Sequence, residues 1–234
     1  MQKTAIIIPC YNEEKRLEKE KVLLLANTGA DIYLCNDGST DNTAGLLQTI
    51  AAECKNCFVL DFKKNTGKGN TVYQSVQHVL SQNQYTHIGY FDADFSTPVF
   101  EIERLLALQE SEPEKFIIGS RVLLLNHNIK RKNFRHYIGR IIITLVNFKF
   151  KLTVYDTQCG AKLFPATIAA VAFNAPFKTS WLFDVELFIR LKKNNLLALG
   201  NEVPLRQWTD VGGSKLGMQS IFTVLAELVT IYRL

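Results

Sequence analysis

The first half of the chain alternates two kinds of apolar pattern. Short runs rich in β-branched and aromatic residues are separated by stretches whose apolar residues recur at helical spacing. This alternation predicts βαβ units, and therefore an α/β fold with a mostly parallel sheet buried on both faces. The expected strands are 4–9, 31–37, 57–62, 87–94 and 115–121. The expected helices between them are 13–26, 41–53, 68–82 and 98–110.

Polar clusters stand where three of these strands end. They are "CYNEE" from residue 10, "CNDGSTDNT" from residue 35 and "FDADFSTP" from residue 91. The carboxyl ends of parallel strands lie at one edge of a sheet, where α/β proteins bind their ligands. The sequence therefore predicts a ligand site formed by these three clusters.

The second half is less regular, and its clearest feature is a pair of amphipathic stripes. The first stripe consists of Ile138, Ile141, Ile142, Leu145 and Val146, and the second of Met218, Ile221, Phe222, Leu225, Leu228, Val229 and Tyr232. Either helix could pack on the sheet, as amphipathic helices usually do. Basic residues flank the first stripe and favour a helix lying in a membrane interface. For the second stripe both interpretations stay open.

Positive charge is concentrated in one segment. The 234 residues suit one large domain, and the net charge of +5 by itself favours neither nucleic acid nor membrane. From Lys115 to Tyr155, however, there are nine Lys or Arg residues and no Asp or Glu. This segment is either a solvated basic loop or the contact for a local anionic partner. Aliphatic residues rather than stacking aromatics lie between the charges, which argues against nucleic acid.

The apolar runs and the cysteines indicate the compartment. The chain enters the strand pattern "TAIIIP" at Thr4 without the features of a signal peptide, and no uncharged apolar run reaches the roughly 18 residues that span a bilayer. Five cysteines are an odd number, and a reduced, cytosolic environment fits them best. Cys54 and Cys57 form a single C-x-x-C, which leaves zinc binding or redox chemistry open.

Two aspartates, Asp92 and Asp94, stand at the end of the fourth expected strand. Neighbouring carboxylates at a strand end repel each other unless a cation, a proton or water separates them. A divalent ion such as Mg²⁺ or Mn²⁺ is held by one or two carboxylates and completes its shell with phosphate oxygens. The alternative is structural: Asp94 or Ser96 caps the helix that begins after Pro98.

Two glycine-containing turns are the other candidates for ligand binding. In "NDGSTDNT", Gly38 permits an unusual backbone angle and the polar residues after it can cap a helix, while Asp37 could also bind a base or ribose. In "NTGKGNT", Lys68 lies between two glycines at a helix start, where it could contact a diphosphate. The pattern of a nucleotide-binding P-loop is absent.

Eight motifs together carry a family resemblance. In order they are "IIIPCYNEEKRL", "NDGSTDNT", "GKGN", "YFDADFSTP", "GSR", "DTQCGAKLF", "WLFDVELF" and a closing "WTDVGGSK". The chain resembles family 2 glycosyltransferases over about residues 4–215, and most closely their polyprenyl-phosphate branch, the dolichyl-phosphate glucosyl- and mannosyltransferases and their bacterial counterparts. "DTQCG" and "WLFDVEL" look closer to the glucosyl than to the mannosyl subgroup.

The resemblance implies a GT-A fold and inverting transfer of a hexose from a UDP- or GDP-sugar. By motif, Asp92 and Asp94 would bind Mg²⁺ or Mn²⁺ on the donor's diphosphate, and Lys215 would close over the phosphates. The full set of residues expected to bind the donor is Pro9, Tyr11, Glu13, Asp37, Lys68, Asp92, Ala93, Asp94 and Lys215.

The acceptor implied by the resemblance is a polyprenyl phosphate. A lipid phosphate is already an anion, so it needs positive charge to bind and orient it rather than a general base. The residues expected to bind the acceptor are Arg121, Arg135, Arg140, Asp156, Gln158 and Trp181. The residues expected to take part in catalysis are Asp94, Arg121, Asp184 and Glu186.

The expected organisation follows from the extent of the resemblance. One glycosyltransferase domain should span 1–215, with a donor half (1–121) and an acceptor half (122–215), and an amphipathic helix should follow at 216–234. The protein should act as a peripheral or monotopic enzyme on the cytosolic face of a membrane, without nucleic acid. Either amphipathic stripe could also be a contact between subunits.

Two alternatives remain at the level of sequence. A family 2 enzyme acting on a sugar hydroxyl would need a base, for which Asp184 or Glu186 could serve. A catalytically silent nucleotide-sugar binder would be expected to have lost a metal ligand, yet Asp92 and Asp94 are both present.

Overall fold

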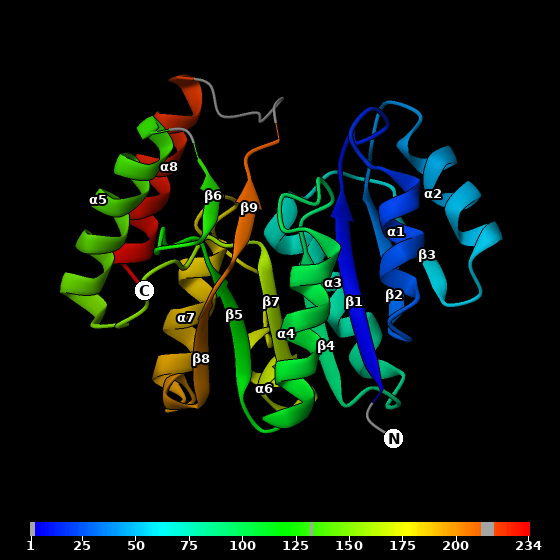
Figure 1. Ribbon diagram of the computed structural model, residues 1–234. Coiled ribbons are helices and arrows are strands. Elements are labelled where there is room, and N and C mark those ends of the chain that lie inside the picture. Colours follow the sequence, from blue (N-terminus) through cyan, green and yellow to red (C-terminus); the bar gives the residue numbers. More distant parts are fainter. Residues whose placement is uncertain (1–2, 132, 212–217) are drawn as a thin grey trace.

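A seven-stranded mixed sheet forms the centre of the molecule (Figure 1). The computed structural model describes residues 3–131, 133–211 and 218–234, and for 133–138 and 218–222 it describes the backbone alone. The strand order is β3-β2-β1-β4-β7-β5-β8, and a separate two-stranded sheet pairs β6 with β9. The strands are β1 (Thr4–Cys10), β2 (Asp31–Asp37), β3 (Cys57–Phe62), β4 (His87–Phe91), β5 (Phe116–Ser120), β6 (Asn128–Lys130), β7 (Ala161–Pro165), β8 (Gly200–Pro204) and β9 (Gln207–Thr209).

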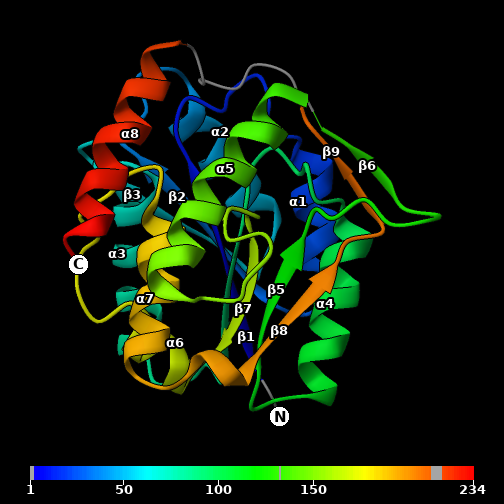
Figure 2. The same cartoon turned by 90° about the vertical axis from the view of Figure 1, so that its left-hand side faces the viewer.

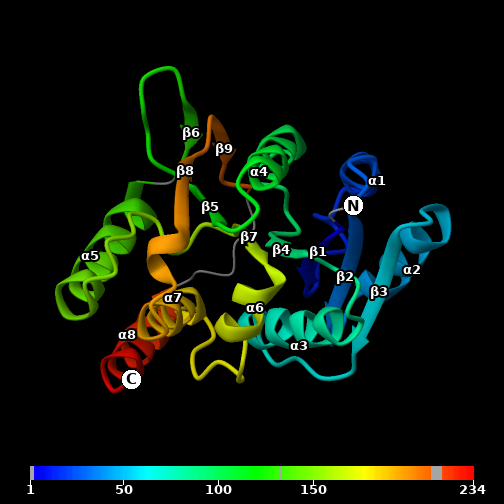
Figure 3. The ribbon, with the colours of Figure 1, turned by 90° about the horizontal axis from the view of Figure 1, so that it is seen from below.

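Helices cover both faces of the sheet, as Figure 3 shows from below. One face carries α1, α2 and α4, and the other carries α3, α6 and α7, each packed over its own apolar cluster. The helices are α1 (Lys19–Ala26), α2 (Thr43–Glu53), α3 (Lys68–Ser81), α4 (Val99–Ser111), α5 (Asn133–Phe150), α6 (Ala166–Ala172), α7 (Phe183–Lys193) and α8 (Met218–Tyr232), and one 3₁₀ turn spans Leu197–Leu199.

The α/β fold expected from the apolar pattern is confirmed. Strands β1 to β4 are all parallel, and β5 is parallel to β8. The exception is β7, which runs antiparallel between β4 and β5 and was not foreseen from the sequence. Because β7 and β8 insert beside strands of the first half, one sheet runs through both expected halves.

Two expected boundaries were wrong, and both lie at the predicted ligand edge. The helix expected from residue 13 begins only at Lys19, because the backbone N–H of Glu13 donates to Thr43 Oγ1 (2.8 Å) and ties this segment to α2. The fourth strand ends at Phe91 rather than residue 94. There the chain turns, and the N–H of Phe95 donates to the carbonyl of Asp92 (3.2 Å). Both corrections place more of the polar clusters in loops.

The two amphipathic stripes lie side by side as α5 and α8 (Figure 2). On α5, Val146 is fully buried, whereas Ile141 and Leu145 are exposed. On α8, Ile231 is buried and Leu225 is exposed. Each helix therefore packs one side against the core. A second apolar side of each helix is not covered by any described residue.

The cysteines differ from the expectation of a reduced chain. Cys54 and Cys57 form a disulfide, while Cys10, Cys35 and Cys159 are free and buried. Burial raises the pKa of Cys35 to about 12. Within the described residues, no group of three or more His, Cys, Asp or Glu side chains could hold a metal ion, so no zinc cluster surrounds the C-x-x-C.

Candidate active site

Loops from the ends of β1, β2 and β4 meet at one edge of the sheet. The first two are joined by hydrogen bonds, in which the N–H of Asn12 donates to Ser39 Oγ (3.0 Å) and the N–H of Thr40 donates to Asn12 Oδ1 (2.8 Å). Asn12 adopts a positive φ of 52°, so the segment that holds Tyr11 and Glu13 makes a tight bend here. These bonds join two of the three polar clusters that the sequence predicted to share a site, and Arg16 in the loop after β1 reaches the third at Asp94 (3.5 Å).

Asp37 fixes the neighbouring glycine loop. Its buried carboxylate accepts N–H bonds from Thr66 (2.8 Å) and Gly67 (3.0 Å). Gly67 has a φ of 84°, and a Cβ there would lie 2.7 Å from Ser180 Oγ, so this position requires glycine. Asp37 therefore positions the loop that ends in Lys68.

The paired aspartates meet two cations supplied by the chain. Lys68 forms an ion pair with Asp92, and Arg16 lies 3.5 Å from Asp94. Arg16 was not identified from the sequence; it also pairs with Glu13 at 2.8 Å. The ammonium and guanidinium groups reduce the repulsion between the two carboxylates in the structure.

Burial and the charge of Asp92 raise the pKa of Asp94 above its ordinary value. Burial alone would lower the pKa of Lys68, but the carboxylates of Asp92 and Asp184 raise it. Gly160 packs directly against the Asp92 carboxylate, where any larger residue would collide with it. The carboxylates are held close together in a partly dehydrated place.

This donor set fits a magnesium or manganese ion bound with a ligand. Asp92 and Asp94 supply hard oxygen donors, and their side chains keep 37% and 18% of their exposure. The described residues offer no third carboxylate, cysteine or histidine that would complete a protein-only site. Oxygens of a bound ligand or of water would fill the remaining positions of the ion's shell.

The end of β5 carries a second, more complete charge pair. Arg121 reaches Asp156 with two guanidinium bonds of 2.7 Å, and its backbone N–H adds a third of 3.0 Å. Burial alone would raise the pKa of Asp156, but the Arg121 guanidinium outweighs it and holds that pKa well below its ordinary value. The ring of Trp208 lies 5.2 Å from the Arg121 guanidinium. Two residues predicted for the acceptor thus bind each other.

A further guanidinium lies near this pair and was not identified from the sequence. Arg131 is half-buried after β6, and burial together with the like charge of Arg121 lowers its pKa. Gln158, another predicted acceptor residue, has a buried Nε2 without a hydrogen-bond partner among the described residues. Positive charge and an unpaired donor therefore gather around one carboxylate.

The remaining predicted acceptor residues are more dispersed. Arg140 donates to the carbonyl of Tyr155 (2.9 Å) and stacks on its ring at 4.0 Å. Trp181 is 36% exposed in the turn before α7. The side chain of Arg135 and all of Lys215 lie outside the described residues.

Asp184 and Glu186 are buried beneath the site rather than open to it. Asp184 is 2% exposed; it accepts bonds from Lys162 Nζ (2.7 Å) and from the Tyr90 hydroxyl. Glu186 is 3% exposed and pairs with Arg190 at 2.7 Å. Neither carboxylate is placed to take a proton from a ligand in this arrangement.

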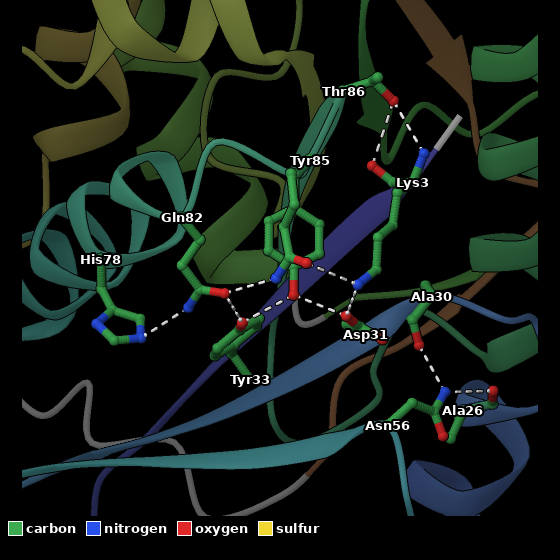
Figure 4. A network of polar contacts seen from close by, with 11 residues as sticks. Lys3, Ala26, Ala30, Asp31, Tyr33, Asn56, His78, Gln82, Tyr85 and Thr86 are labelled. Carbon is green, nitrogen blue, oxygen red and sulfur yellow. Dashed lines mark hydrogen bonds and ion pairs between the residues drawn. The ribbon is translucent and has the colours of Figure 1, made fainter. Parts of the chain in front are cut away.

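A cavity of about 740 Å³ lies at the opposite ends of the same strands. Its polar side chains are paired with one another (Figure 4). Tyr85 donates to Asp31 (2.7 Å) and shares a 2.8 Å hydrogen bond with Tyr33, while Lys3 lies 2.9 Å from Asp31. This network connects the start of β2 to the segments before β1 and β4, so we assign it a structural role. The edge that carries Asp92 and Asp94 is the better candidate for the active site.

Comparison with known proteins places these observations in a family. The family described as Glycosyl transferase family 2 matches residues 5–182, about three quarters of the chain. The chain belongs to this family. It is accordingly a glycosyltransferase, and specifically a hexosyltransferase.

Relatives with known names agree with this assignment. A dolichyl-phosphate beta-glucosyltransferase of Drosophila melanogaster is 31% identical over 91% of this chain and 68% of its own length. One from Saccharomyces cerevisiae is 29% identical over 98% of this chain and 74% of its own length. A third, from Trichomonas vaginalis, is 27% identical over 97% of this chain and 72% of its own length.

Solved structures of glycosyltransferases share the fold. Glucosyl-3-phosphoglycerate synthase from Mycobacterium tuberculosis, solved with Mn²⁺ and UDP, aligns with a TM-score of 0.69 at 14% identity, over 99% of this chain and 78% of its own. TarS from S. aureus, solved with UDP, gives a TM-score of 0.58 at 12% identity, over 98% of this chain and 65% of its own. The GT-A fold implied by the sequence motifs is confirmed.

Proposed function

We propose that the protein transfers a glucosyl group, with inversion, from a UDP-sugar to a polyprenyl phosphate at a membrane surface. The observation that carries the proposal is the placement of two opposite charge clusters around one site. Paired acids follow β4, and the acid-free basic segment that begins at Lys115 places Arg121 at the end of β5. The names of the relatives favour glucose and a dolichyl phosphate.

The donor would bind at the acid cluster. A divalent ion held by Asp92 and Asp94 would stabilise negative charge on the departing diphosphate. Lys68 and the ion would compete for Asp92, so the Lys68 ammonium would be free to contact a phosphate once the ion is bound. Pro9, Tyr11, Glu13, Asp37, Ala93 and Lys215 remain proposed donor contacts. Of these, Asp37 is argued to act through the Gly67 loop that it holds.

The acceptor phosphate would bind at the basic cluster. Arg121 is preoriented by its bidentate bonds to Asp156, and Arg131 adds a positive charge beside it. Arg135, Arg140, Gln158 and Trp181 remain proposed acceptor contacts. Because a phosphate monoester attacks as an anion, this half of the reaction requires orientation and charge rather than a base.

Burial of Asp184 and Glu186 weakens the hydroxyl-acceptor alternative. That alternative requires a carboxylate that can reach the acceptor's proton. Both candidates are almost fully buried and held in ion pairs with Lys162 and Arg190. We assign them instead a supporting role under the site.

A lipid acceptor also requires contact with a membrane, and two exposed apolar surfaces support it. Leu123, Leu124 and Leu125 lie just after Arg121 and Val122 and are 69%, 45% and 91% exposed. They are presented by a fixed turn, since the N–H of His127 donates to the carbonyl of Leu124 (3.1 Å). The uncovered side of α5 is the second surface. No helix among the described residues is long and apolar enough to cross a bilayer.

A product assay tests the proposal. The protein is incubated with Mn²⁺, a short polyprenyl phosphate and either UDP-glucose or GDP-mannose. We expect a glucosyl-phospholipid from UDP-glucose that is labile to mild acid, and little product from GDP-mannose. Transfer to a sugar hydroxyl but not to the lipid phosphate would contradict the acceptor assignment. Flotation with anionic vesicles tests the membrane contact, and recovery in the soluble fraction alone would contradict it.

A further inference from the structure

Helix α8 contains one charged residue in an otherwise uncharged sequence, "MQSIFTVLAELVTIY". That residue, Glu227, is half-buried and turned toward the start of α7. Its two carboxylate oxygens accept backbone N–H bonds from Ser180 (2.8 Å), Trp181 (2.9 Å) and Leu182 (2.9 Å). Three consecutive amides of one turn are therefore held by a side chain 45 or more residues away.

The bonded turn is the entry to α7. Leu182 is the residue before the helix, and its carbonyl accepts the first helical bonds from Val185 (2.9 Å) and Glu186 (3.1 Å). Amides at a helix start have no partner within the helix, and the helix dipole favours a negative charge there. Glu227 supplies both the acceptors and the charge from a different helix.

The same turn packs against the loop that carries Lys68. A Cβ on Gly67 would lie 2.7 Å from Ser180 Oγ, and the ring of Phe183 lies against Gly69 and 5.7 Å from Lys68 Nζ. One residue after Phe183 stands Asp184, which is bound to Lys162 beneath the site. Moving this turn would therefore displace groups on both sides of the site.

Helix α8 is itself anchored to the basic, apolar helix α5. The Tyr232 hydroxyl donates to the carbonyl of Leu145 (2.8 Å), and the ring of Phe150 lies 6.2 Å from that of Tyr232. Figure 3 shows α8 beside α7, and Figure 2 shows it beside α5. The helix thus connects one of the surfaces proposed to contact the membrane with the turn at the site.

We infer that Glu227 is a positioning residue, because it holds the backbone amides of Ser180, Trp181 and Leu182. Through these bonds, the position of α8 determines the positions of Trp181 and of the loop that carries Lys68. Glu227 acts through the turn and contacts no substrate. The catalytic consequence rests on the proposed function, whereas the positional one does not depend on it.

The positional consequence is tested by fluorescence without any substrate. The chain has two tryptophans, so the Trp208→Phe background leaves Trp181 as the single emitter. In that background we expect Glu227→Gln and Glu227→Ala to shift Trp181 emission to the red and to raise its quenching by acrylamide, Ala more than Gln. Thr230→Ala on the same helix, which removes only a bond to the Ala226 carbonyl, is the matched control and should change neither.

A purely structural role would have a different signature. It predicts a lower melting temperature for Glu227→Gln with Trp181 emission and quenching unchanged. We expect the reverse, a small change in melting temperature with a clear change in quenching. Quenching identical to the parent protein in both variants would overturn the inference. If Glu227→Ala does not fold, the near-isosteric Glu227→Gln decides alone.

The catalytic consequence is tested in the transfer assay with Trp208 intact. We expect Glu227→Gln to lower kcat/KM for the acceptor roughly tenfold, since small misplacements of orienting groups are costly. The Thr230→Ala control should keep the parent value. Altered quenching with unchanged transfer kinetics would contradict the link to catalysis. A parent protein inactive toward lipid phosphate would instead contradict the proposed function and leave the fluorescence result standing.

Discussion

The two ends of the site hold partly buried charges of opposite sign. Carboxylates lie together at the end of β4, and guanidinium groups lie together at the end of β5. At the end of β4, Asp92 and Asp94 are offset by Lys68 and Arg16, yet the pKa of Asp94 remains raised by burial and by its neighbour. The charged form of Asp94 therefore stays disfavoured despite these two cations. Such a place gains stability from a further cation.

At the end of β5 the like charges that lie near each other are positive, those of Arg121 and Arg131. Asp156 is fully engaged by Arg121, and the pKa of Arg131 is lowered by burial and by the neighbouring guanidinium. An added anion would relieve that repulsion. In the proposed function, each of the two anionic reactants would be drawn to its own partners, so they need not share a single cluster of positive charge.

The largest expected effect is the loss of transfer in Asp94→Ala. Removing this carboxylate removes half of the proposed metal site and the charge stabilisation that depends on it. We expect kcat to fall on the order of a thousandfold. The measurement is single-turnover transfer to lipid phosphate at saturating donor, with circular dichroism to establish that the fold is intact. Unchanged turnover would contradict the metal role of the pair.

Next in size is the stability lost in Asp156→Asn. This change leaves the Arg121 guanidinium buried without its counter-charge, which should cost about 3 kcal/mol at pH 7. The native pKa of Asp156 is depressed, so the pair contributes fully above the ordinary carboxyl range near pH 4 and progressively less below it. Urea unfolding at pH 7, 5 and 3 measures the free energy of unfolding of the parent protein and of Asp156→Asn. The difference between the two free energies should become smaller only below about pH 4.

The control for this prediction is Glu18→Gln, which breaks an exposed pair with Lys21. An exposed pair of this kind should contribute nothing measurable to stability. If the free energies of unfolding of the parent protein and Asp156→Asn differ by the same amount at all three pH values, the charge of Asp156 is not what stabilises the pair.

A smaller effect is expected for Arg121→Lys, which keeps the charge and removes the bidentate geometry. We expect kcat/KM for lipid phosphate to fall roughly a hundredfold, because the acceptor is no longer oriented. The KM for the nucleotide sugar should stay near the parent value. If the donor KM moves and the acceptor KM does not, the two ends of the site have been assigned the wrong way round.

The sequence predicted positions better than partners. The ends of β1 and β2 could be derived from apolar runs, because a buried parallel strand leaves a local pattern, whereas β4 ends at Phe91, before the expected residue 94. The burial of Asp184 could not, because it depends on Lys162 in β7, a strand that was not foreseen. Arg16 and Glu227 were missed for the same reason, since their partners lie 78 and about 46 residues away.

The central claim is that the paired acids form a metal site that becomes complete only with a nucleotide diphosphate. Electron paramagnetic resonance of Mn²⁺ tests it directly, by counting free ion during titration of the protein with and without UDP. We expect weak binding of Mn²⁺ alone, tight binding of one ion when UDP is present, and loss of that gain in Asp92→Asn. Equal Mn²⁺ affinity with and without UDP, or a gain that survives Asp92→Asn, would contradict the account.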